Sequence, residues 1–135
     1  MHLYLYTDGA SRGNPGPSAI GIVIKNERQE NLREISRYIG QGTNNNAEYF
    51  AVLIAVKEAY KLRAENVTLF VDSELVARQL SGTYKVKNKL LLQYFKGIAN
   101  IIREFKAFEV TRIERKNNSE ADKLANRALD NIRLI

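Results

Sequence analysis

The sequence predicts an α/β fold with a five-stranded mixed sheet and helices on both faces. Three observations support this class. The first forty residues contain short β-rich apolar runs separated by turn residues, as in an antiparallel meander. Longer segments with helical spacing follow at residues 44–62 and 88–105. Strand patterns lie between and after these segments, and a strand–helix–strand passage implies a right-handed parallel crossover.

Three strands are expected in the N-terminal part. Residues 2–7 alternate Leu with aromatic or polar residues, and a turn signal should end this strand. Residues 9–18 concentrate glycine and contain both prolines, so we expect them to form a loop. Residues 19–24 are a short β-rich run, and residues 32–39 form a weaker third strand.

The remaining elements alternate between helix and strand. The helix at residues 44–62 follows helical spacing through Ala47, Ala51 and Ile54. The later elements are a strand at 66–71, a short helix at 73–81, a helix at 88–105, a strand at 107–113 and a helix at 119–132. With no repeat or internal linker, we expect residues 1–135 to form one domain.

Composition narrows the functions that remain open. The chain has no cysteine, which excludes disulfides and thiolate zinc sites, and its single histidine, His2, argues against a histidine-based triad. A net charge of +6, from 21 Lys and Arg against 15 Asp and Glu, favours an anionic partner such as nucleic acid. No apolar run reaches the roughly 20 residues of a membrane span. The N-terminus also lacks a signal-peptide pattern, so we expect a cytoplasmic protein.

Four acidic residues fall where predicted strands or helices begin or end. Asp8 and Asp72 follow the first and fourth strands, and they would lie side by side if these strands are neighbours. Glu48 lies in the first turn of a helix, and Asp122 opens the last helix. Clustered carboxylates repel one another, and Mg²⁺ resolves this because it prefers oxygen ligands. Two such ions about 4 Å apart are the usual apparatus for phosphodiester hydrolysis.

Each acid taken singly also has a structural interpretation. Asp8-Gly9 is a common turn signal. Three positions match helix-capping patterns: Asp72 before Ser73, Glu48 three residues after Asn45, and Asp122 three residues after Ser119. For any one acid the structural interpretation is the more common case, and only the set of four favours a catalytic site.

Four stretches of the sequence resemble the motifs of type I ribonucleases H. They are TDGASRGNPG at residues 7–16, TNNNAE at 43–48, VDSELV at 71–76 and NSEADKLAN at 118–126. They occur in the family's order and span nearly the whole chain. One motif alone would be weak evidence, whereas four at compatible spacing are highly specific.

The resemblance implies a ribonuclease H-like fold, with three antiparallel strands followed by two parallel ones. It also implies an endonuclease that hydrolyses the RNA strand of an RNA–DNA hybrid and leaves 5′-phosphate and 3′-hydroxyl ends. The cofactor would be two Mg²⁺ ions, for which Mn²⁺ can substitute. Asp8 would bridge the two ions, and the other protein ligands would be Glu48, Asp72 and Asp122.

The resemblance also assigns residues to substrate binding. Asn14, Asn44 and Asn45 would lie in the minor groove of the hybrid, and Thr43 would meet the DNA backbone. A wide, shallow minor groove exposes the 2′-hydroxyls that distinguish RNA from DNA, which suits amide side chains. A turn before Pro15 and an ordinary helix start are the alternative explanations of these residues.

One departure from the family pattern concerns a loop before the fourth acid. Some members carry a histidine there, which is thought to help proton transfer or product release. This chain has ERKNN at residues 114–118 instead. Glu114, Arg115 or Lys116 could take over that role, or the metal-activated water could suffice.

A second departure concerns a basic protrusion that some members insert after the third motif. Here residues 82–88 are short, although Lys85, Lys87 and Lys89 cluster there. The cluster could contact phosphates or could be an ordinary solvated loop. Weaker affinity for the hybrid is one consequence of the short form.

Two other classes of function remain open at this point. The first is a related nuclease of other specificity, acting on double-stranded RNA or as an exonuclease, although an exonuclease would not need the asparagines beside Glu48. The second is a non-catalytic hybrid-binding domain, which predicts a missing carboxylate, whereas all four are present. The expected partner is the RNA–DNA hybrid duplex. We expect a monomer with no membrane contact and no obligate protein partner.

Overall fold

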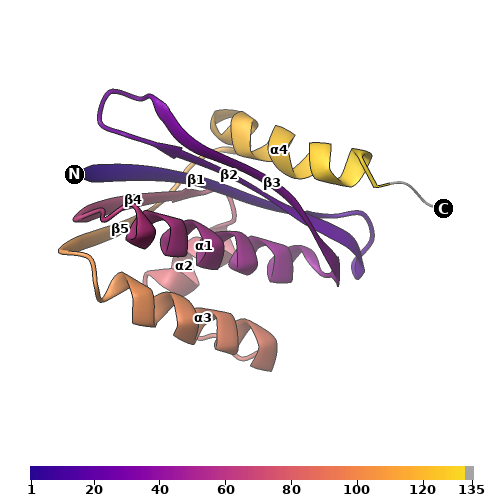
Figure 1. Cartoon of the computed structure of the whole chain (residues 1–135). Coiled ribbons are helices and arrows are strands. Elements are labelled where there is room, and N and C mark those ends of the chain that lie inside the picture. Colours follow the sequence, from indigo (N-terminus) through magenta and orange to yellow (C-terminus); the bar gives the residue numbers. More distant parts are fainter. Residues whose placement is uncertain (133–135) are drawn as a thin grey trace.

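The computed structural model describes residues 1–132 and has a five-stranded mixed sheet with helices on both faces (Figure 1). The elements are β1 His2–Ser11, β2 Gly16–Lys25, β3 Asn31–Gly42, α1 Asn44–Lys61, β4 Asn66–Val71, α2 Glu74–Leu80, α3 Lys89–Ile102, β5 Ala107–Arg112, the 3-10 helix η1 Arg115–Asn118 and α4 Ser119–Asp130. The predicted fold class and order of strands and α-helices are confirmed. The short helix η1 was not predicted.

The sheet has the strand order β3-β2-β1-β4-β5. β1 pairs antiparallel with β2, and β2 pairs antiparallel with β3. β1 also pairs in parallel with β4, and β4 pairs in parallel with β5. The predicted neighbourhood of the first and fourth strands is therefore confirmed, and β1 is the central strand.

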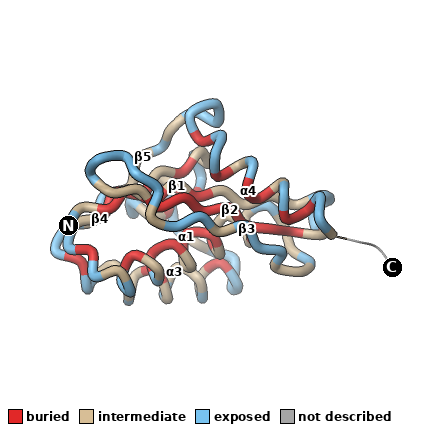
Figure 2. The backbone as a smooth tube through the Cα atoms, turned by 45° about the horizontal axis from the view of Figure 1, so that its top comes forward, coloured by how far each residue is buried: buried red, intermediate tan, exposed pale blue. Residues whose placement is uncertain are grey.

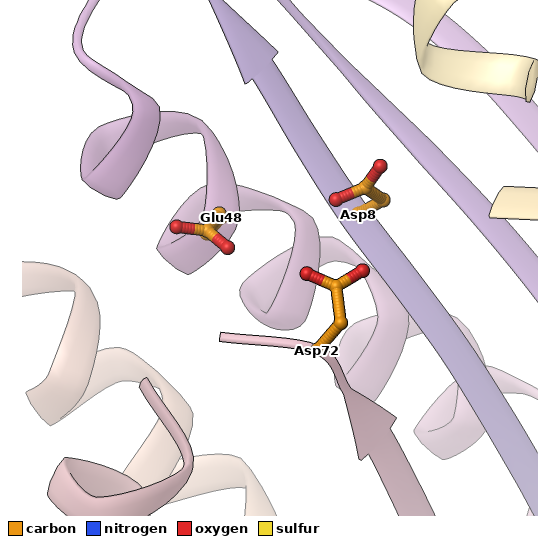
Figure 3. Close-up of side chains that lie close together, drawn as sticks. All are labelled: Asp8, Glu48 and Asp72. Carbon is orange, nitrogen blue, oxygen red and sulfur yellow. The ribbon is translucent and has the colours of Figure 1, made fainter. Parts of the chain in front are cut away.

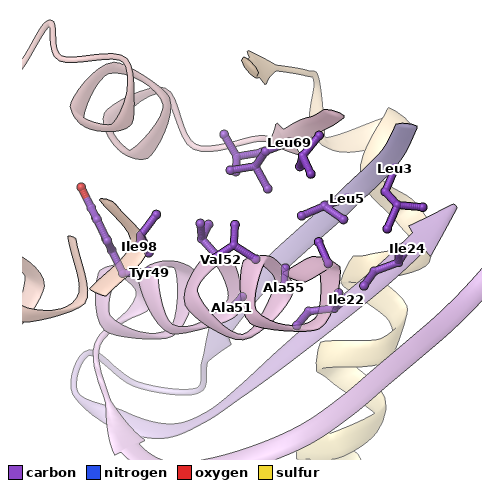
Figure 4. Close-up of a cluster of buried hydrophobic side chains, with 14 of the residues drawn as sticks. Leu3, Leu5, Ile22, Ile24, Tyr49, Ala51, Val52, Ala55, Leu69 and Ile98 are labelled. Carbon is purple, nitrogen blue, oxygen red and sulfur yellow. The ribbon is translucent and has the colours of Figure 1, made fainter. Parts of the chain in front are cut away.

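The main core lies between the sheet and α1, with α3 packed beyond α1, while α4 covers the other face (Figure 1). Leu3 and Leu5 of β1 and Val52 of α1 are fully buried in this core (Figure 4). The sequence of β2 reads as a continuous apolar run because both of its faces are covered. Figure 2 shows the buried residues following β1 and β2, and the exposed turn at residues 27–30.

The predicted loop at residues 9–18 is wrong for most of its length. β1 continues to Ser11 and β2 begins at Gly16, so that only residues 12–15 connect the two strands. Gly9 is needed for close packing and not for a turn, since a Cβ atom there would lie 2.3 Å from the backbone nitrogen of Glu48. Glycine marks loops and close backbone contacts alike, and the sequence does not separate the two.

Asp8 consequently lies within β1 and not at its end, contrary to the prediction. The parallel pairing with β4 stops at Tyr6 and Phe70, while the antiparallel pairing with β2 continues past Asp8. Asp8 therefore still stands where a neighbouring strand ends.

Among residues 1–132, none of the helices combines the length and apolar character that crossing a bilayer requires.

Candidate active site

Three of the four predicted acids come together at the end of β4. Each of Asp8, Glu48 and Asp72 offers a carboxylate oxygen, and these oxygens all lie within 4.8 Å of one another. The three carboxyl groups approach from β1, from α1 and from the residue after β4 (Figure 3). An all-oxygen donor set of this kind fits a hard divalent cation such as Mg²⁺.

Gly9 allows Glu48 to reach Asp8. A Cβ atom at position 9 would lie 2.3 Å from the carbonyl carbon of Ala47 and 2.3 Å from the nitrogen of Glu48. The first turn of α1 therefore rests directly on the backbone of β1, one residue after Asp8. The absence of a side chain at this position sets the separation of the two acids.

The fourth acid, Asp122, approaches Asp8 from the other face of the sheet. Asp8 pairs with Gly21 of β2, and a Cβ atom on Gly21 would lie 1.9 Å from the carbonyl oxygen of Ala121. α4 therefore contacts the sheet one residue before Asp122. The amide Nδ2 of Asn126 donates to Oδ1 of Asp122 over 3.2 Å and orients it.

The local environment keeps protons on Asp8 and Glu48 near neutral pH. Burial, followed by the negative charges of Asp72, Asp122 and Glu48, raises the pKa of Asp8 to about 8. Burial and the charge of Asp72 raise the pKa of Glu48 to about 7, and the nearby Arg115 opposes that rise. Carboxylates that are costly to ionise without a cation are typical of a metal site.

The structure contradicts the capping interpretations of these acids. The N-cap of α1 is Thr43, whose hydroxyl accepts from the backbone N–H of Asn46 in a reciprocal capping box. Ser73, and not Asp72, caps α2 by accepting from the N–H of Val76. At α4 the N-cap residue is Asn118, and its side chain makes no capping hydrogen bond.

The four residues predicted to bind substrate line one groove beside the acids. This groove has a volume of about 540 Å³. The backbone N–H of Asn44 donates to Oδ1 of Asn14 over 3.1 Å, which joins the β1–β2 connection to the start of α1. The residues that line the groove are Asn14, Thr43, Asn44, Asn45, Asn46, Asn88, Leu90 and Leu91.

One residue of this groove, Asn88, was not predicted from the sequence. Asn88 caps α3 by accepting from the N–H groups of Leu90 and Leu91. A polar residue before an apolar helix predicts only a cap, so the sequence carried no signal that Asn88 would face the asparagines of α1.

Of the three candidates in the 114–118 stretch, Arg115 lies beside the acids. Arg115 lines a polar pocket together with Asp8, Glu48 and Asp122. Lys116 instead pairs with Glu114 over 3.8 Å, and both side chains are well exposed. Arg115 is therefore the cation of this stretch available to the site.

The lysine cluster is exposed and anchored at one end. The amide of the buried Gln79 donates through Nε2 to the backbone oxygen of Lys85 over 3.1 Å. Its Oε1 accepts from the hydroxyl of Tyr49, the residue next to Glu48. The segment that carries Lys85, Lys87 and Lys89 is thus tied to α1 beside the acids, although its lysine side chains face solvent.

The strand order and the clustered acids define a ribonuclease H-like domain. A family model described as reverse transcriptase-like matches residues 6–128. The crystal structure of RNase H1 from Halobacterium salinarum superposes with a TM-score of 0.94 at 36% identity, covering 98% of this chain and 100% of that one. LC11-RNase H1 in complex with an RNA/DNA hybrid gives a TM-score of 0.89 at 41% identity, over 95% and 96% of the two chains. The chain belongs to the ribonuclease H family.

Curated relatives also match nearly the whole of this chain, but they are longer than it. Ribonuclease HI of Halobacterium salinarum is 37% identical over 128 residues, which cover 95% of this chain and 64% of that protein. The bifunctional protein Rv2228c of Mycobacterium tuberculosis is 37% identical over 131 residues, which cover 96% of this chain and 36% of that protein. This chain therefore corresponds to only part of these relatives.

Proposed function

We propose that this protein is an endoribonuclease that hydrolyses the RNA strand of RNA–DNA hybrids and leaves 5′-phosphate and 3′-hydroxyl ends. The observation that carries the proposal is the meeting of Asp8, Glu48 and Asp72 within 4.8 Å, beside a groove lined with amides. A carboxylate cluster supplies the chemistry, and the amides supply contacts to a polar duplex groove.

Two Mg²⁺ ions, or Mn²⁺ in their place, would activate the attacking water and neutralise the charge that develops on the leaving ribose oxygen. The carboxylates of Asp8, Glu48, Asp72 and Asp122 would hold them. Asp8 has Glu48 and Asp72 on one side and Asp122 on the other, which supports a bridging role. Because Asp8 and Glu48 retain protons near neutral pH in the metal-free protein, cation binding must release protons from this cluster.

The amide groove would bind the RNA strand. Asn14, Asn44 and Asn45 offer donors and acceptors to 2′-hydroxyls, while Thr43 would reach the DNA backbone. The hydroxyl of Thr43 already accepts a capping hydrogen bond, and its proton remains available for a phosphate oxygen. The likeness to LC11-RNase H1, whose structure contains an RNA/DNA hybrid, supports this choice of duplex.

Arg115 would take the place of the loop histidine of other family members. Its guanidinium lies at the pocket that contains Asp8, Glu48 and Asp122, and it favours the ionised form of Glu48. A guanidinium cannot act as a base at neutral pH, so Arg115 would bind the phosphate and not transfer the proton.

Residues 1–135 would form one domain that acts as a monomer in the cytoplasm and needs no obligate protein partner. The family match over residues 6–128 supports a single domain. Sedimentation of the purified protein, alone and with hybrid, checks the monomer.

End-group analysis of the products tests the proposed chemistry. A hybrid of defined length should give internal cuts whose products accept a 5′-label only after phosphatase treatment and can be extended from their 3′ ends. The cuts should require Mg²⁺ or Mn²⁺. Mononucleotides released from one terminus only, or equal cleavage in excess chelator, would contradict the proposal.

A further inference from the structure

Asn118 occupies a buried junction beside the acids. It is only 1% exposed and lies between η1 and α4. Its amide Nδ2 donates to the backbone oxygen of Thr7 over 2.8 Å and to Oδ2 of Asp72 over 2.9 Å. Both acceptors belong to other elements, 111 and 46 residues away in the chain.

These two contacts fix which way the amide points. Rotating it by half a turn would place Oδ1 against two acceptors, so the NH₂ group must face Thr7 and Asp72. In this orientation Oδ1 is buried and has no hydrogen-bond partner among the described residues. A buried acceptor without a partner lowers stability, and such a residue calls for an explanation other than packing.

The junction connects the chain segments that carry three of the acids. Thr7 immediately precedes Asp8 on β1, Asp72 follows β4, and Asn118 lies four residues before Asp122. One NH₂ group therefore bridges β1 and the residue after β4 just beyond the point where their pairing ends. It also holds one oxygen of Asp72 and so limits rotation of that carboxylate.

We propose that Asn118 is a positioning residue for metal binding, which acts by orienting Asp72 relative to Asp8. The inference rests on the proposed function only in that the acids bind divalent cations, and not on the nucleic acid. Partners that orient the side chains holding a metal commonly change metal affinity by 10-fold or more when removed. A purely structural residue at the same place would lower the stability of the fold and leave metal affinity unchanged.

Metal binding without nucleic acid tests the proposal. Mn²⁺ binding is followed by electron paramagnetic resonance, and Mg²⁺ binding by the rise in Tm across a titration. Asn118→Ala should raise the dissociation constant for both ions about 10-fold or more. Asn117→Ala is the matched control, because Asn117 is exposed on the same turn, and it should change the constant less than twofold.

A double-mutant cycle separates positioning from a general effect. In an Asp72→Ala background, Asn118→Ala should have little further effect on metal affinity, because the partner through which it acts is gone. An unchanged dissociation constant in Asn118→Ala, even with a lower Tm, would overturn the proposal, as would a full effect in the Asp72→Ala background.

If Asn118→Ala does not fold, Asn118→Ser is measured instead. Its single hydroxyl proton can serve only one of the two acceptors, so the dissociation constants for both ions should still rise, and unchanged constants would overturn the proposal. A parent protein that binds metal but leaves hybrids intact would count against the proposed function and not against this role of Asn118.

Discussion

Gly21 of β2 lies directly beneath the carbonyl oxygen of Ala121, and a Cβ atom at position 21 would lie 1.9 Å from that oxygen. The same glycine pairs with Asp8 across the β1–β2 ladder. One missing side chain therefore sets how closely α4 packs on the sheet and how near Asp122 lies to Asp8.

We expect Gly21→Ala to lower the free energy of unfolding by roughly 3 kcal/mol, because the added methyl group meets backbone that cannot move aside without shifting α4. Urea denaturation in chelator measures this. Gly42→Ala is the control, since the nearest atoms to a Cβ there lie at 3.5 Å, and it should cost less than about 0.5 kcal/mol. Equal stability of the two variants would show that α4 is not held at the sheet by Gly21.

The raised pKa values predict how stability depends on pH in the absence of metal. The pKa of Asp8 is about 8 in the fold against 3.8 for an unperturbed group, and that of Glu48 is about 7 against 4.5. The folded state therefore binds more protons than the unfolded state between these values. The contribution of these two groups to the stability of the folded state is therefore greatest below about pH 4, and it falls as the pH rises to 8.

Asp8→Asn should remove much of this dependence. In chelator at pH 8, we expect the variant to be more stable than the parent by about 1 kcal/mol or more, and to lose cleavage activity. Added Mg²⁺ should raise the Tm of the parent and raise that of the variant much less. Asp130→Asn, at an exposed acid paired with Arg12, should show no such gain. A variant of Asp8 that melts well below the parent in chelator would make Asp8 a structural residue.

The sequence predicts the site better than it predicts the surroundings of the site. The four acids can be predicted because their motifs are local, and each motif contains its own acid. The strand that carries Asp8 was misplaced because Gly9 signals a turn and a close helix contact equally well. The contact of Asn118 with Thr7 spans 111 residues, and only the folded chain brings the two together. Asn88 was likewise not predicted, because only the folded chain brings it to the asparagines of α1.

Adjacent asparagines on α1 should separate binding from stability. Asn45 lines the groove without a capping role. Asn45→Ala should therefore weaken binding of the hybrid by about 1–2 kcal/mol, which raises KM and leaves kcat largely unchanged. Asn46 closes the capping box with Thr43, so Asn46→Ala should cost about 1 kcal/mol of stability. Steady-state kinetics and urea denaturation on both variants provide the comparison. A collapse of kcat with fixed KM in Asn45→Ala would remove Asn45 from substrate recognition.

The lysine cluster should affect how strongly binding of the hybrid depends on salt concentration. Replacing Lys85, Lys87 and Lys89 together by Ala should reduce the slope of log Kd against log salt by up to about one unit per lost phosphate contact. The positions of the cuts should stay the same.

The control replaces three other exposed lysines, Lys57 and Lys61 of α1 and Lys106 before β5, with the same change in charge. Binding measured at several salt concentrations distinguishes the two triple variants. Identical slopes would make residues 82–89 an ordinary surface loop.

Strand-specific cleavage is the sharpest test of the proposed activity. An RNA–DNA hybrid with different labels on its two strands is incubated with the protein in Mg²⁺, next to double-stranded RNA, double-stranded DNA and each single strand. We expect internal cuts in the RNA strand of the hybrid, an intact DNA strand, and no cuts in excess chelator or with Asp8→Asn. Cleavage of the DNA strand, or an intact RNA strand under conditions in which the protein binds Mg²⁺ and hybrid, would contradict it.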